Sequence, residues 1–376
     1  MPRLALALLF CICASAQPLF QRTDEMLNTL SEITGWKVRR KVPAKLLSRQ
    51  AFRKQTEAQA KKADKRGVHV EELTLKMFGL VPDDFDLTAE SVDLISEQAA
   101  AFYDYNKKQL FVLDGSQEGT EQEIALAHEL AHALADQQNN LKKFIARGNP
   151  GDDESTARQA VMEGQATWLS LAYLSRRFGG PPEVPPQMLA QFNDLTGASG
   201  GDYPVYTMAP LYVRESLTFP YNEGLRFADE SYRKLGKNSF SEVFARPPQG
   251  TQHVLHPASY FEGRTIAPIS PPQPPSGAKW KLLADGDIGE QDTALILGTH
   301  IGEDTGKQFA IHWKGGQYRL MESPSKKPLL MHAIEWDSQE SARGYAEAYL
   351  KVMRGDRKST RLNSSHIPLS RMPSSA

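Results

Sequence analysis

The stretch EQEIALAHELAHALADQQNN, residues 121–140, is the part of the chain from which the fold is most readily inferred. Thr120 and Glu123 stand three residues apart, as in a capping box, so we expect a helix from Thr120 through Gln137. One apolar face of this helix repeats every fourth residue, at Leu126, Leu130 and Leu134. These apolar flanks predict a helix that is buried in the core.

His128 and His132 lie one turn apart on a different side of this helix from the leucines. Two imidazoles on one face can hold the same cation, and the pattern HExxH is typical of a zinc site. Glu129 projects about 100° from His128 and would reach a water on the metal as its general base. A chance match on a surface helix is the alternative, but buried histidines need a partner such as a metal. Asp136, one turn beyond His132, is expected to accept the free N–H of a ligand histidine.

Catalytic zinc usually takes three protein ligands, so a third is expected elsewhere in the chain. The segment 152–174 predicts a second apolar helix, in which Glu163 is surrounded by small and apolar residues. A carboxylate in such surroundings is rarely buried unless it is paired. Gly164, next to it, would allow another helix to approach closely. Asp152 to Glu154 are expected to cap this helix instead.

Strand-like and Pro-rich segments define the rest of the organisation. A hairpin is predicted from Ala101–Asp104 and Gln109–Leu113. In a terminal domain, 293–301, 307–323 and 328–336 are interpreted as strands and 338–353 as a closing helix. The predicted divisions are a signal peptide at 1–16, a helical connector at 17–67, a main domain at 68–266, a Pro-rich linker at 267–279, a small α+β domain at 280–355, and a sequencing-adaptor artefact at 356–376.

The 376-residue chain, 40% hydrophobic, is long enough for a sizeable core. Residues 1–16 combine Arg3, an apolar run and a small-x-small motif, which predicts an exported, periplasmic or extracellular protein; an uncleaved anchor is the alternative. Both cysteines lie inside this segment, so disulfides are not expected. Removing Arg3 and the tail, with its four basic residues and one acid, changes the net charge from −1 to −5. This charge argues against nucleic acid as a partner.

HELAHALAD together with a glutamate on a following helix resembles the gluzincin zinc metallopeptidases, which are thermolysin-like. Features such as FYDYNKKQLFVLD and MEGQATW are similar to a group of exported bacterial HExxH proteins of unknown substrate. The resemblance implies an α+β zincin-like core, one Zn²⁺ on His128, His132 and Glu163, and peptide hydrolysis with Glu129 as base. The 30 residues between His132 and Glu163 exceed the spacing usual in thermolysin, which an inserted loop would explain.

The remaining parts of such a site are less clearly marked. Candidate oxyanion donors are His256 and Tyr260, with Tyr221 ranked below them. The strand with Gln109, Phe111 and Leu113 is expected either to pair with an extended peptide or protein substrate or to be an ordinary core strand. His300, His312 and His332 are predicted on separate strands with structural roles. The alternatives to a peptidase are a catalytically silent zinc-containing binding or envelope protein, and a zinc hydrolase of a non-peptide amide.

Overall fold

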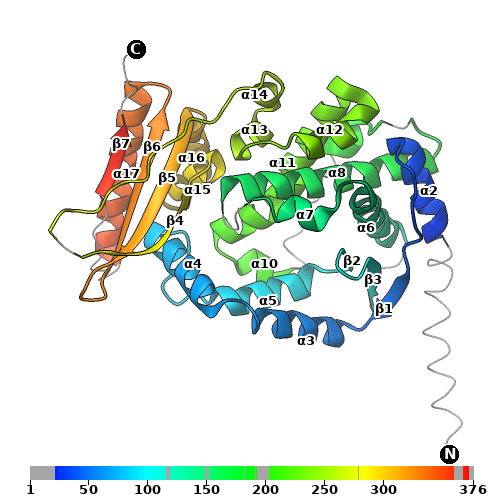
Figure 1. Cartoon of the computed structure of the whole chain (residues 1–376), viewed down its shortest axis with the longest axis horizontal. Coiled ribbons are helices and arrows are strands. Elements are labelled where there is room, and N and C mark those ends of the chain that lie inside the picture. Colours follow the sequence, from blue (N-terminus) through cyan, green and yellow to red (C-terminus); the bar gives the residue numbers. More distant parts are fainter. Residues whose placement is uncertain are drawn as a thin grey trace, which may run out of the picture.

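The computed structural model describes residues 22–115, 119–148, 152–181, 183–190, 192, 203–277, 279–359 and 367–371, with side chains up to residue 354. The predicted signal peptide, 1–16, lies outside the described residues. The fold is mixed α+β and mainly helical with two small sheets, which confirms the predicted class at this level (Figure 1). Within the described part of the chain, no helix has both the length and the apolar character needed to cross a membrane.

The first elements in chain order are α2 (Thr23–Thr34), β1 (Ala44–Leu47), α3 (Arg49–Ala60), α4 (Lys65–Phe78), α5 (Leu87–Gln98), β2 (Ala101–Asp104), β3 (Gln109–Leu113), α6 (Thr120–Asn139), α7 (Leu141–Ile145) and α8 (Asp153–Arg177). They are followed by α10 (Pro204–Met208), α11 (Leu211–Leu235), η2 (Gly236–Asn238), α12 (Ser239–Ala245), α13 (Thr251–Leu255) and α14 (Pro257–Phe261). The last are β4 (Lys281–Asp287), α15 (Glu290–Ile301), α16 (Glu303–Ala310), β5 (Trp313–Glu322), β6 (Pro328–Trp336), α17 (Gln339–Ser359) and β7 (Ile367–Arg371).

The first sheet has the strand order β1-β3-β2, and the predicted hairpin of β2 and β3 is confirmed with its predicted bounds. β1, from the segment predicted as a helical connector, pairs in parallel with β3, so that Ala44 lies opposite Leu110. β3 is therefore the central strand, and both of its edges are occupied. The expectation that Gln109, Phe111 and Leu113 form a substrate-binding rim is wrong, because β3 is paired on both sides and the outer strands are β1 and β2; β3 is the core strand of the alternative reading.

α6 begins at Thr120, as predicted, but the capping box that predicted this start does not form. The N-cap is Gly119, at φ 98°, and the Glu123 carboxylate turns into the core instead. There it accepts hydrogen bonds from Arg22 and from the Tyr173 hydroxyl, each at 2.8 Å, and pairs with Arg177. A buried carboxylate needs such partners, so Glu123 fastens α6 to α2 and α8.

α8 and α11 cross at two glycines, as the position of Gly164 beside Glu163 predicted. A Cβ at Gly164 would lie 2.0 Å from the carbonyl carbon of Gly224, and one at Gly224 would lie 2.4 Å from the Ala160 oxygen. Only glycine permits backbones to approach this closely. The crossing places Tyr221, three residues before Gly224, on the same part of α11 that faces Glu163.

The two larger hydrophobic cores divide the chain differently from the predicted domains. The first gathers α2, the first sheet, α6, α8, α11 and α12. The second joins α4 to α15, β5, β6 and α17, although α4 falls mostly inside the predicted main domain 68–266. Figure 1 shows these two assemblies at opposite ends, with α3, α4 and α5 running along one side. The Pro-rich segment 267–279 also departs from a free linker, since Ala267 donates its N–H to the Lys314 oxygen of β5 at 3.1 Å.

The second sheet has the order β4-β5-β6-β7, and its outer strands β4 and β7 were not predicted; β7 lies in the segment 356–376 that was interpreted as an artefact. Residues 293–301, predicted as a strand, belong to helix α15, so this prediction is wrong. The apolar run TALIL is buried against the sheet on one side of α15, and a short buried run cannot be assigned by its period alone. His300 accordingly lies on a helix and His312 just before β5, where it contacts Asp337 at 2.8 Å; only His332 lies on its predicted strand.

Asp153 joins the two cores at the start of α8. Its Oδ2 accepts the Thr251 N–H at 3.0 Å, while its Oδ1 has no partner among the described residues. Gly250 and Gly289 flank the carboxyl group so closely that a Cβ at either would lie about 2 Å from its oxygens. Burial, with repulsion from Asp292 and Asp287, raises the pKa of Asp153 to about 8.

Asp153→Asn is expected to flatten the pH dependence of stability. A carboxyl of ordinary pKa loses its proton near pH 4 in the unfolded chain, whereas folded Asp153 keeps it up to about pH 8. The Asp153 contribution to stability is therefore complete below pH 4 and lost as the pH rises to about 8, at about 1.4 kcal/mol per pKa unit. Urea unfolding of both proteins at pH 5 and pH 8 measures this effect. A constant difference between wild type and variant would contradict it, and Asp152→Asn is the control.

Candidate metal centre

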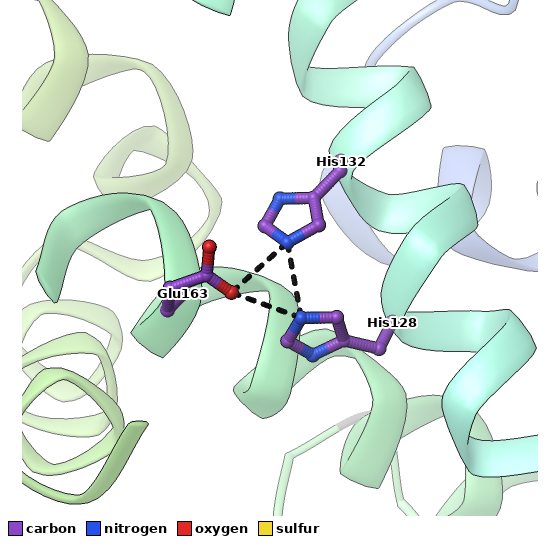
Figure 2. A group of neighbouring side chains, drawn as sticks. All are labelled: His128, His132 and Glu163. Carbon is purple, nitrogen blue, oxygen red and sulfur yellow. Dashed lines mark hydrogen bonds and ion pairs between the residues drawn. The ribbon is translucent and has the colours of Figure 1, made fainter. Parts of the chain in front are cut away.

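Three predicted ligands converge from two helices, α6 and α8. The Nε2 atoms of His128 and His132 are 3.0 Å apart, and each lies 3.1 Å from Oε2 of Glu163 (Figure 2). His132 is buried and the other two side chains are partly buried. Among the described residues, these three form the one group of His, Cys, Asp or Glu side chains whose geometry could hold a metal ion.

This triangle fits zinc. Ligand distances of about 2.0–2.2 Å in a tetrahedral arrangement separate the ligand atoms by about 3.4 Å. The observed separations of 3.0 and 3.1 Å are a few tenths of an ångström shorter, so the ligands need to move only slightly apart. Two imidazoles and one carboxylate leave a fourth position open, which is the composition of catalytic zinc sites.

The two carboxyl groups near this triangle have opposite protonation tendencies. Burial acts to raise the pKa of Glu163, but contacts with His132 and His128 outweigh it and hold the pKa well below its ordinary range. Burial raises the pKa of Glu129 to about 7, against the attraction of His128. Two acids whose surroundings drive their pKa values apart are suited to different roles, a charged ligand and a proton carrier.

Glu129 is held by the backbone of strand β2. The Tyr103 N–H donates to its Oε2 at 2.7 Å, and Glu129 lines the same cavity as the three ligands. The carbonyl oxygen of Ala100 accepts a hydrogen bond from Leu113 of β3, so the backbone groups of Ala100 point toward β3. In an antiparallel pair the next residue, Ala101, points its backbone groups to the opposite edge of β2, as Tyr103 does. Ala101 therefore presents its N–H and C=O next to Glu129. The contact from Tyr103 was missed at the sequence level because a backbone donor leaves no pattern of residue types.

Asp136 does not support a histidine, contrary to the prediction. Nδ1 of His132 is buried and has no hydrogen-bond partner among the described residues. The Asp136 carboxylate instead holds the β2–β3 hairpin and the chain before β1 against α6, which sets the position of β2 beside Glu129. It accepts bonds from the Tyr103 hydroxyl at 2.9 Å, Lys108 Nζ at 2.6 Å, Arg40 at 3.3 Å and the Leu141 N–H at 3.1 Å.

His256 and Tyr260 lie away from the metal centre, so their predicted catalytic role is wrong. His256 Nε2 contacts Glu290 of α15 at 2.7 Å, and the Tyr260 hydroxyl donates to the Arg246 oxygen at 2.6 Å. Neither residue lines the cavity that contains the ligands. Both hold α13 and α14 against their neighbours, as a structural His-Pro turn would.

Tyr221, the candidate ranked lowest, is the one that reaches the site. Its ring stacks on His128 with centroids 5.9 Å apart and planes inclined by 26°. The negative charge of Glu163, then burial and Glu129, raise the pKa of Tyr221 well above its ordinary value, and its hydroxyl bonds to Glu163. The group therefore stays protonated as a hydrogen-bond donor.

A cavity of about 750 Å³ extends from the ligands between α5, β2, α6 and α8. Most of its walls are apolar, as at Ile124, Leu171, Met188 and Phe192, and no lysine or arginine lines it within the described ranges. A second cavity of about 260 Å³ shares Met162, Glu163 and Tyr221 with the first. Glu163 therefore lines two neighbouring cavities.

Comparisons of the chain with protein-family models, with curated proteins and with solved structures found no match.

Proposed function

We propose that the chain is a zinc-dependent peptidase with a zincin-like core of the gluzincin type. The observation that carries this proposal is the convergence of His128, His132 and Glu163 while Glu129 faces the same cavity without being a ligand. A zinc site that is purely structural needs ligands but no general base. The apolar segment at 1–16 supports export, and the net charge of −5 without the two terminal segments argues against nucleic acid as a partner.

When bound, zinc would polarise the scissile carbonyl and make a water molecule more acidic. Glu129 accepts a proton from the attacking water molecule while the oxygen of that water forms a bond to the carbonyl carbon. The carbon–nitrogen bond then breaks, and Glu129 delivers that proton to the leaving amine. The Tyr221 hydroxyl, which bonds to Glu163 in this structure, would turn to donate its hydrogen bond to the oxyanion that develops in between.

The free edge of β2 supports an extended substrate. The backbone N–H and C=O of Ala101 face this edge, and a peptide strand could pair with them beside Glu129. The apolar walls of the cavity, including Ile124 and Leu171, would receive a large apolar side chain next to the scissile bond. The large cavity at the site, with a second cavity that also contacts Glu163, favours a peptide over a small non-peptide amide.

Removal of zinc is expected to abolish hydrolysis, which tests the proposal. The chain from Gln17 should contain about one zinc and cleave quenched-fluorescence peptides that carry Phe or Leu at one position. 1,10-Phenanthroline should stop cleavage, and added zinc should restore it. Stoichiometric zinc with no turnover of any peptide in a diverse library would favour a silent binding protein instead. Absence of zinc binding would refute both readings.

A further inference from the structure

Among the described residues, Thr167 is the side chain at hydrogen-bond distance from Nδ1 of His128, the ring nitrogen that does not face the other two predicted ligands. It lies on α8 one turn after Glu163, so both side chains project from the same face of that helix. Its hydroxyl is 3.4 Å from Nδ1 of His128, and the residue is only 3% exposed. One helix thus provides a ligand and also contacts the ligand of another helix.

The chemistry of imidazole determines which group donates and which accepts the hydrogen bond in this contact. Nε2 of His128 faces His132 and Glu163, so a metal there would use the Nε2 lone pair. The ring must then carry its proton on Nδ1, and that N–H needs an acceptor. The Thr167 hydroxyl oxygen can accept it. Stacking by Tyr221 fixes the plane of the same ring but cannot choose its tautomer.

We infer that Thr167 is a positioning residue that selects the metal-binding tautomer of His128 and fixes its ring. The inference rests on the proposed metal site. The acceptor is a neutral hydroxyl, while the nearby carboxylate of Asp136 is engaged by Tyr103 and Lys108. Neither histidine therefore has a carboxylate acceptor for its Nδ1 among the described residues. The orientation of the His128 ring consequently depends in part on this one weak, well-buried contact.

Substitution of Thr167 tests the inference through zinc binding. Thr167→Val keeps the shape of the side chain but removes the acceptor, and should weaken zinc binding by about 10–100-fold, as loss of an outer hydrogen bond does. Thr167→Ser keeps the hydroxyl and should stay close to wild type. Ser170→Ala is the matched control, because Ser170 is buried on the same helix and lines the same cavity but bonds to the Thr167 carbonyl.

The readouts are the zinc dissociation constant, by competition with a chromophoric chelator, and ¹⁵N NMR of the histidine rings in the zinc-free protein, where no metal sets the tautomer. Wild type should show the His128 proton on Nδ1, and Thr167→Val a broadened or mixed signal. Equal zinc affinity in Thr167→Val and wild type would overturn the inference while leaving the proposed function intact. A similar loss in Ser170→Ala would also overturn it, since packing alone would then explain the effect. Failure of wild type to bind zinc would refute the proposed site itself, and the role of Thr167 with it.

Discussion

Glu129→Gln is expected to lower kcat/KM for peptide hydrolysis by about 10²–10⁴-fold while zinc stays bound. The amide keeps the size of the side chain and can still contact β2, but it cannot take up a proton from water. A loss of this size corresponds to about 3–5 kcal/mol of transition-state stabilisation. Steady-state kinetics on a quenched peptide, together with metal analysis of the same preparation, measure both quantities.

Glu121→Gln is the matched control for this variant. Glu121 lies two turns earlier on α6 and lines the same cavity, yet it contacts none of the three ligands. The same chemical change there should leave kcat/KM within about threefold, since a surface substitution has a small effect. If the Glu129→Gln protein remained active, Glu129 would not be the general base. Loss of zinc from it would assign Glu129 to metal binding.

Glu163→Ala is expected to weaken zinc binding by more than about 100-fold, because it removes one of three ligand atoms and not merely a group that orients a ligand. The remaining histidines, 3.0 Å apart at their Nε2 atoms, would form a two-ligand site. The variant should be isolated with little zinc and without activity. Equilibrium dialysis against buffered zinc gives the dissociation constant.

Gln159→Ala controls for changes to α8 itself. Gln159 is exposed one turn before Glu163 and lines the smaller adjoining cavity. Its removal should leave zinc affinity unchanged. Undiminished zinc binding in Glu163→Ala would show that Glu163 is not the third ligand, whatever the activity of the variant.

The sequence predicted that His128, His132 and Glu163 come together because helical spacing and burial are local properties. His128 and His132 follow from a four-residue repeat, and Glu163 from its apolar neighbours. Gly164 predicted a close helix contact, which Gly224 provides. The bounds of β2 and β3 were also predicted, since a turn-prone segment separates two β-prone runs.

The sequence did not predict features that depend on long-range contacts. Nothing in the local sequence of Ala44–Leu47 indicates that this segment pairs with β3. For this reason β3, and not β2, was predicted to be the edge strand of the hairpin. Asp136 has the spacing of a histidine partner, but Lys108 and Tyr103, from another element, occupy its carboxylate. Tyr221 could have been ranked higher, because its position three residues before a glycine suggested a close helix crossing. The strand assigned to 293–301 failed because packing outweighed the β-prone composition.

The pairing of β1 with β3 also has a consequence for the order in which the chain folds. β1 leaves the ribosome early, but Ala44 finds its partner Leu110 only after 66 further residues have been made. Closing so long a loop is slow relative to forming the hairpin or the helices, whose contacts are local. We therefore expect β2, β3 and α6 to assemble first and the earlier-made strand to dock onto them afterwards. Pulse-labelling hydrogen exchange should then show late protection of Lys45 to Leu47, the segment synthesised before the rest of its sheet.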